Sequence, residues 1–197
     1  MPIENQYSAD WFNIFLVARS GYKVLGIDLN PDVIEQARKL AGGQAEFVVH
    51  DMRRLDALSG RFDAAINMWQ SFGYFDDESN RRILAAINEK LNPQGRFIID
   101  IYNRDFFVDK QGEQQFERAG QRIIERKALV EKTLTVDLDY GESGASSRFV
   151  WQVYTPEEFV QLASECGFEM VASGTNADSK LPPSPEYPRM QFILQKR

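Results

Sequence analysis

Cysteine and histidine are nearly absent from this chain of 197 residues: Cys166 is its only cysteine and His50 its only histidine. An internal disulfide needs two cysteines, and a structural zinc site needs four Cys or His ligands, so both are excluded by count. A metal site made of carboxylates alone would have no recognisable motif here. We therefore expect no disulfide and no metal.

Excess positive charge and long apolar runs are also missing. The 23 Lys and Arg residues are outnumbered by 29 Asp and Glu, which gives a net charge of −6, whereas nucleic-acid-binding proteins display clustered basic residues. Four basic residues occur within 118–127, but acidic residues interrupt them, and this pattern favours a solvated strand face. We expect a small-molecule substrate and no nucleic acid. No apolar run reaches the length of a membrane span, and residues 1–5 lack the features of a signal peptide, so we expect a cytoplasmic protein without a membrane partner.

The composition that remains is that of a globular protein, with 43% hydrophobic and 26% charged residues. A chain of this length can bury one sizeable core and is short for two ordinary domains. We therefore expect residues 1–197 to form a single domain, with an insertion over residues 103–154.

Strand and helix patterns alternate along the first hundred residues. A short helix is expected over Trp11–Arg19, a buried strand over 22–27 and a second strand over 45–49. Between these strands, Asn30-Pro31-Asp32 is a favourable helix start, with a capping residue, a proline in the first turn and an acidic residue near the positive helix end. Gly42 ends this helix, whose apolar stripe consists of Val33, Ile34, Ala37, Leu40 and Ala41.

The same alternation continues after residue 60. A strand is expected over 62–68, a helix over 77–91, a turn over 92–95 and a buried strand over 96–101. Strands that alternate with single helices predict a mostly parallel sheet covered by helices on both faces, which is a three-layer α/β/α arrangement.

From residue 102 to 154 the periodicity changes, because apolar and polar residues alternate as in half-buried antiparallel strands. Thr155-Pro-Glu-Glu158 then forms a capping box that opens a last helix, and Gly167 ends it. Closing strands are expected over 168–172 and 190–194. The insertion is thus predicted to be an antiparallel β cap.

Polar residues follow the predicted parallel strands, where ligands bind in sheets of this kind. Asp28 follows the first strand, and its carboxylate can accept two hydrogen bonds from ribose hydroxyl groups. Asp51 follows the second strand and could accept a hydrogen bond from an adenine amino group. For both residues the alternative is that the side chain caps the next helix or turn. Asn67 and residues 100–103 stand at two further strand ends.

Four segments, in this order, resemble the successive motifs of the class I S-adenosylmethionine-dependent methyltransferase family: residues 21–31, 46–52, 62–68 and 91–97. Residues 70–75, 102–105 and 153–158 resemble a bacterial small-molecule subgroup with a β insertion after the fifth strand. The resemblance covers most of the chain from Ala18 onward. It implies a Rossmann-like methyltransferase sandwich with an antiparallel closing strand.

The resemblance also implies roles for individual residues. Asp28 would contact the ribose of S-adenosylmethionine, Leu29 would pack against the adenine, and Asp51 and Met52 would lie at the adenine edge. Asn67 and Met68 would border the methionine part, and S-adenosylhomocysteine would be the product. An acceptor would enter beneath the cap, where the candidate contacts are Tyr74, Tyr102, Asn103, Arg148, Trp151 and Tyr154, each of which could equally be an ordinary packing or surface residue.

One family motif does not appear. The family's sheet begins with a strand that ends in a glycine-rich loop, where the backbone approaches the cofactor closely because glycine has no Cβ. Before Asp28 the chain has only Gly21 and Gly26, so we expect that this strand, its loop and most of the first helix are either deleted in this protein or absent from the given residues. Gln94 stands where the family more often has glycine, and we expect an effect on turn geometry only.

No catalytic base is assigned. His50 precedes Asp51, but a single histidine is more often structural or exposed. Cys166 falls in the last turn of a helix and is interpreted as a core residue. Methyl transfer often needs no strong base, because the sulfonium is a good leaving group and positioning supplies much of the rate.

The sequence therefore leaves two classes of function open. The first is an enzyme that methylates an O, N or C nucleophile of a small molecule. The second, motivated by the missing glycine-rich loop, is a cofactor-deficient or non-catalytic relative that binds a partner or dimerises, so a homodimer is among the expected states. An NAD-linked oxidoreductase is disfavoured because the glycine fingerprint is absent.

Overall fold

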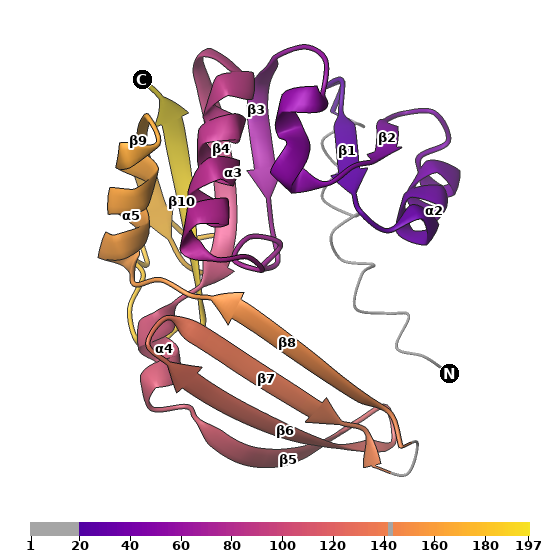
Figure 1. The fold of residues 1–197 in the computed structure, drawn as a ribbon, viewed down its shortest axis with the longest axis vertical. Helices are drawn as coiled ribbons and strands as arrows, with labels where there is room; N and C mark the ends of the chain where they lie inside the picture. The colour runs from indigo at the N-terminus through magenta and orange to yellow at the C-terminus, as the bar shows by residue number, and fades with distance from the viewer. Residues whose placement is uncertain (1–19, 142–143) are drawn as a thin grey trace. The chain divides into compact units, whose positions relative to one another are not determined.

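The computed structural model describes residues 20–141 and 144–197 (Figure 1). The chain forms two compact units that divide after Gly60. The helix predicted over Trp11–Arg19 lies outside the described residues. No helix in the described ranges is long and apolar enough to cross a membrane.

The first unit contains one strand-helix-strand motif. Its described elements are β1 (Leu25–Asp28), α2 (Pro31–Ala41), β2 (Glu46–Val49) and the 3-10 helix η1 (Met52–Ala57). Strands β1 and β2 are parallel, and their register pairs Asp28 with Val49. The predicted strand-helix-strand order is confirmed, whereas η1 was not predicted.

Local signals explain the ends of α2. The side chain of Asn30 accepts a hydrogen bond from the Asp32 N–H at 2.9 Å, and Gly42 closes the helix at a φ of +53°. Leu40 was wrongly placed in the apolar stripe, since it is 68% exposed. It is not part of the cluster that packs against Phe47.

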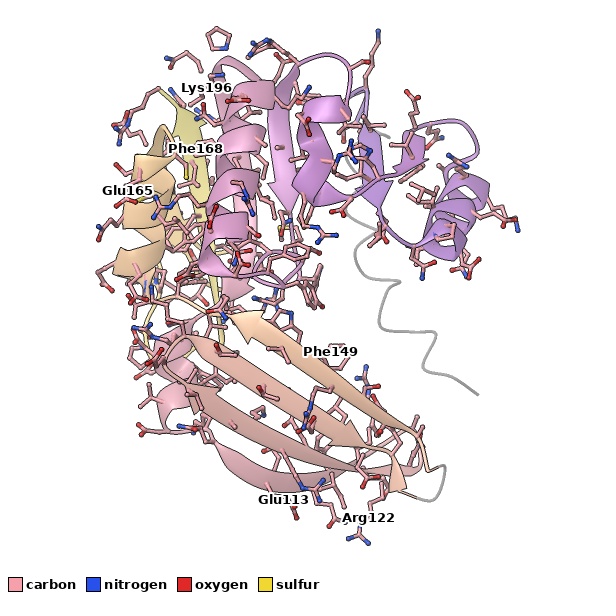
Figure 2. All side chains as sticks on the ribbon, in the orientation of Figure 1. Glu113, Arg122, Phe149, Glu165, Phe168 and Lys196 are labelled. Carbon is pink, nitrogen blue, oxygen red and sulfur yellow. The ribbon has the colours of Figure 1, made fainter. Side chains whose placement is uncertain are left out.

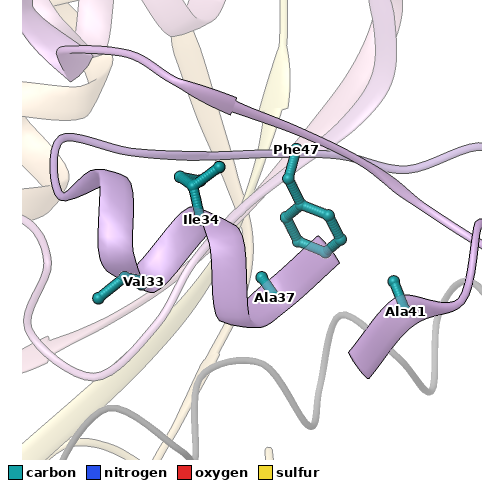
Figure 3. Packing of buried hydrophobic residues seen from close by; sticks show 5 residues of the cluster. All are labelled: Val33, Ile34, Ala37, Ala41 and Phe47. Carbon is teal, nitrogen blue, oxygen red and sulfur yellow. The ribbon is translucent and has the colours of Figure 1, made fainter. Parts of the chain in front are cut away.

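The buried face of α2 packs on one aromatic ring. Figure 3 shows Phe47 of β2 directed toward the helix, where the buried residues are Val33, Ile34, Ala37 and Ala41. The ring also lies over β1, because Gly26 is its register partner there. A Cβ added to Gly26 would lie 2.5 Å from Phe47 Cδ1, so the chain needs glycine at this position.

We expect Gly26→Ala to destabilise the first unit by about 1–3 kcal/mol, the usual cost of overpacking a core. Local unfolding is measured by hydrogen exchange of the β2 amides, which should exchange faster in the variant. Adding Phe47→Leu makes room for the new methyl group, so the two substitutions together should cost less than the sum of their separate costs. Additive costs would mean that the ring contact is unimportant.

The second unit is built on a four-stranded sheet with the order β3-β4-β10-β9. Its elements are β3 (Phe62–Asn67), α3 (Asp77–Lys90), β4 (Leu91–Tyr102), α5 (Pro156–Glu165), β9 (Phe168–Gly174) and β10 (Arg189–Lys196). Strands β3 and β4 are parallel, and β10 is antiparallel to both β4 and β9, which confirms the antiparallel closing strand. Helices α3 and α5 lie next to each other over this sheet (Figure 1).

The predicted turn over 92–95 lies inside β4 as a bulge. The register shifts there, because Phe62 pairs with Leu91 while Ala64 pairs with Arg96. Gln94 has a φ of +64°, a left-handed conformation that glycine adopts without strain. Further along the chain, the predicted capping box is confirmed: Thr155 Oγ1 accepts from the Glu158 N–H at 3.2 Å, and the Glu158 carboxylate accepts from the Thr155 N–H at 3.1 Å.

The β cap follows β4. It consists of the short helix α4 (Arg104–Val108) and an antiparallel sheet of β5 (Gly112–Arg118), β6 (Gln121–Val130), β7 (Thr133–Asp139) and β8 (Ser146–Gln152). One face carries a row of alternating charges across the four strands, namely Glu113, Arg126, Asp137 and Arg148. The other face, here called the inner face, packs with α4 through Leu134, Val136 and Trp151. The register places Phe149 on the inner face and Glu113 on the charged face (both are labelled in Figure 2).

Candidate functional site

The carboxyl end of β1 presents Asp28. Its Oδ1 accepts a hydrogen bond from the Asn30 N–H at 2.8 Å, and its Oδ2 has no partner within residues 20–141 and 144–197. The N-cap of α2 is Asn30, so Asp28 does not cap this helix. Leu29 beside it is 64% exposed. One carboxylate oxygen and an apolar side chain are thus available for a ligand at this strand end.

Asp51 lies just beyond the carboxyl end of β2, and its carboxylate is largely occupied. It caps η1 by accepting from the Arg53 N–H at 2.9 Å, and Oδ2 accepts from Arg53 Nη2 at 2.6 Å. Hydrogen bonds from Arg53 lower the pKa of Asp51. The capping role considered for Asp51 is therefore present in the structure, and a contact with adenine remains a prediction, as it does for the half-buried Met52.

His50 makes structural contacts. Its backbone N–H donates to the Asp28 carbonyl at 2.8 Å, and its Nε2 lies 2.7 Å from the Arg54 carbonyl oxygen. Because a carbonyl oxygen only accepts, Nε2 must carry the proton. This arrangement supports the structural interpretation of His50.

In the second unit, Asn67 ends β3 and pairs in register with Ile99. Its Oδ1 atom is buried and has no hydrogen-bond partner among the described residues. A buried oxygen without a donor is costly, so it marks a place where a ligand's N–H or O–H group would fit. The half-buried Met68 follows, and its carbonyl accepts from Ser71 Oγ at 3.0 Å.

The loop after β3 is strained. Trp69 and Gln70 both take left-handed backbone angles, with φ of 58° and 66°. The buried Gln70 holds the loop in place, because its Nε2 donates to the Phe72 carbonyl at 3.0 Å and its Oε1 accepts from the Tyr102 N–H. Sequence reasoning did not identify Gln70 as functional.

Arg189 places a positively charged guanidinium group near the carboxyl end of β3. Its Nε donates to both carboxylate oxygens of the buried Asp100, at 2.9 and 3.0 Å. Its guanidinium lies between two rings, 5.3 Å from the centroid of Trp69 and 5.1 Å from that of Tyr102. Arg189 follows a proline-bearing loop far along the chain from β3 and β4, and no local sequence signal indicated this position.

Three of the predicted acceptor contacts lie together. Trp151 on the inner face of the cap has its ring centroid 5.6 Å from that of Tyr74 and 5.3 Å from that of Tyr102. Burial raises the pKa of Tyr102, the Arg189 cation opposes this rise, and the carboxylates of Glu125 and Asp100 add to it. Trp151 Nε1 is buried without a partner in the described chain, so a donor is available.

The other three predicted contacts lie elsewhere. Asn103 is buried, and its side chain caps α4 and donates to the Ser184 carbonyl at 2.8 Å. Arg148 pairs with Asp137 on the charged face of the cap. The hydroxyl of Tyr154 donates to Asp77 and accepts from Asn80, which links the end of the cap to α3. Burial raises the pKa of Tyr154.

Two further observations concern a possible nucleophile and a possible metal site. Cys166 is the C-cap of α5 and is partly buried, and burial raises the pKa of its thiol, which disfavours a nucleophilic role. Within the described ranges, no group of three or more His, Cys, Asp or Glu residues could hold a metal ion.

Comparisons with known proteins agree with this geometry. Residues 12–95 match the family model described as a methyltransferase domain. YqeM of Bacillus subtilis strain 168, whose name assigns it provisionally to the methyltransferases, is 22% identical over 91% of this chain and 78% of its own.

Solved structures show the same fold. The CcbJ methyltransferase of Streptomyces caelestis superposes with a TM-score of 0.78 at 16% identity, over 92% of this chain and 78% of that one. CalS10, an amino pentose methyltransferase of Micromonospora echinaspora solved with S-adenosylmethionine bound, gives a TM-score of 0.69 at 15% identity, over 98% and 93% of the two chains. The chain thus shares the Rossmann-like α/β fold of these methyltransferases, and residues 12–95 match a methyltransferase domain.

Proposed function

We propose that the protein transfers a methyl group from S-adenosylmethionine to an O, N or C nucleophile of a small molecule. The observation that carries this proposal is the carboxylate of Asp28, which ends β1 with one oxygen uncommitted among the described residues. A carboxylate at this position suits vicinal hydroxyl groups, because it can accept two charge-assisted hydrogen bonds.

The first unit holds groups that fit the nucleoside part of the cofactor. In the first unit, Asp28 would hold the ribose, and Leu29 and Met52 would provide apolar surface for the adenine, with Asp51 at its edge. In the second unit, the buried Oδ1 of Asn67 has no donor among the described residues, so an N–H or O–H group of a ligand would fit there, and Met68 follows Asn67 along the chain. The cofactor, when bound, supplies a methyl group on a good leaving group, so the protein's main task is to position the acceptor in line with it.

The acceptor site is proposed at the cluster of Tyr74, Tyr102 and Trp151, where aromatic surface meets the Trp151 N–H, which has no partner in residues 20–141 and 144–197. A small molecule fits this cluster and the net charge of −6, which disfavours a nucleic acid. CalS10, which shares the fold, is named as an amino pentose methyltransferase. We propose that Asn103 and Tyr154 support the structure around this site, because their polar groups bond within the protein, whereas Arg148 pairs with Asp137 on the charged face of the cap.

Calorimetric titration with S-adenosylhomocysteine tests the proposal. We expect saturable heat and a rise in the unfolding temperature, because a ligand that binds the folded state stabilises it. The absence of both at millimolar ligand would contradict the enzyme assignment and favour the alternative of a cofactor-deficient binding module.

A further inference from the structure

Two charged residues point into the apolar face of the cap. In the register of the sheet, Lys127 stands in a row with Val136 and Phe149, and Glu125 stands in the next row with Leu138. Side chains paired across antiparallel strands share a face, so both charges lie on the inner face. Lys127 Nζ pairs with Glu125 Oε2, and the two side chains are only 17% and 15% exposed.

This placement costs stability. The outward charges Glu113 of β5 and Arg126 of β6 are 58% and 49% exposed and keep most of their hydration. The inward pair gives up hydration, and a well-packed apolar pair at such a position is often as stable or more stable. Because β5 lies between β6 and the sheet edge, protection of an exposed edge does not explain the inward charges.

The carboxylate of Glu125 has spare accepting capacity. Lys127 Nζ and Gln114 Nε2 both donate to its Oε2, whereas its Oε1 has no partner in the described chain. The register partner of Glu125 is Leu138, and Leu138 and Tyr102 pack against the same apolar cluster, while the Glu125 carboxylate contributes to the raised pKa of Tyr102. Tyr102 in turn contacts Trp151, which stacks on Phe149 at 5.3 Å. The carboxylate of Glu125, paired with Lys127 through one oxygen, therefore lies on the same face of the cap as the aromatic acceptor cluster.

From this geometry we infer that Glu125 is a specificity residue that binds an amino group of the acceptor. The inference rests on the proposed function and narrows its substrate class to amines. A carboxylate next to aromatic rings favours an ammonium ion, since the ring faces attract cations and the carboxylate accepts charge-assisted hydrogen bonds. Lys127 and Gln114 hold Glu125 in position and reduce the cost of keeping it charged.

Benzylamine and benzyl alcohol are a matched pair of probes, because both carry one ring and only the amine is a cation at neutral pH. Their dissociation constants are measured by ligand-observed NMR in the absence of cofactor. We expect the amine to bind roughly tenfold more tightly than the alcohol. Glu125→Gln should bring the two constants within about twofold of each other, since the charge is lost and the shape is kept. Glu113→Gln, on the charged face, should leave the ratio unchanged.

A second variant separates recognition from folding. Glu125→Leu combined with Lys127→Met replaces the pair by apolar side chains, so we expect an equal or higher unfolding temperature together with loss of the amine preference. If Glu125 and Lys127 had only a structural role, the double variant would not lose the amine preference while its unfolding temperature stayed equal or rose.

Other outcomes overturn the inference. These are equal binding of both probes to the unaltered protein, no binding of either probe, a preference that survives Glu125→Gln, or tighter binding of benzoate that is lost in Lys127→Met. Titration of the same samples with S-adenosylhomocysteine is read separately, so failure of cofactor binding is distinguished from failure of amine recognition.

Discussion

Asp28→Ala is expected to weaken the binding of S-adenosylhomocysteine by about 1.5–3 kcal/mol, the range for hydrogen bonds to a charged group. This corresponds to a roughly 10- to 150-fold rise in the dissociation constant measured by calorimetry. The loss should be specific to binding, because within the described chain Asp28 makes one side-chain hydrogen bond, to the Asn30 N–H, and Asn30 itself caps α2.

Glu46→Ala is the matched control for Asp28→Ala. Glu46 begins β2, at the opposite end of the same two-stranded sheet, and its side chain is exposed, so the variant loses the same charge away from the proposed ribose site. We expect its affinity to equal that of the unaltered protein. If Asp28→Ala keeps full affinity, or if both variants lose it equally, the placement of the ribose is wrong.

Gly73→Ala should be the most damaging single methyl addition in the loop after β3. Gly73 has a φ of +101°, and an added Cβ would lie 2.6 Å from the Gln152 carbonyl oxygen of the cap. Backbone strain and overpacking together should lower the free energy of unfolding by about 2–5 kcal/mol in denaturant titrations. The variant should also disturb the neighbouring Tyr74 and therefore the acceptor cluster.

Gly120→Ala separates the two causes. Gly120 also has a positive φ, +75°, but no atom lies within 4 Å of its added Cβ. Its cost should be limited to the strain of a left-handed residue, about 1–2 kcal/mol. Equal losses of unfolding free energy in the two variants would mean that the close contact between the added methyl group and the Gln152 carbonyl oxygen contributes nothing to the loss.

Much of the fold was predictable because its signals are local. The N-cap at Asn30 and the capping box from Thr155 to Glu158 are each encoded within four residues, and the structure confirms both. The alternation of strand and helix patterns likewise predicted the parallel pairing of β1 with β2 and of β3 with β4. Leu40 was misplaced because helical periodicity indicates an apolar stripe without its width, which depends on the strands that cover it.

The candidate site was predictable only in part. Asp28 was visible because it ends its strand. Arg189 was missed because it meets Trp69 and Tyr102 through tertiary contacts alone. The segment containing Lys127 was interpreted as a solvated face, but strand alternation turns Arg126 outward and Lys127 inward, and the register that decides this depends on β7.

The attachment of Tyr154 bears on how quickly an acceptor can enter. Its hydroxyl bonds to Asp77 and Asn80 on α3, and two residues earlier the Gln152 N–H donates to the Gly73 carbonyl at 2.7 Å. The end of β8 is thus held to the loop and helix that follow β3. Opening the cap as a body would break these bonds, so we expect acceptor exchange to be governed by side-chain rotations on the picosecond-to-nanosecond scale, without a slow opening step.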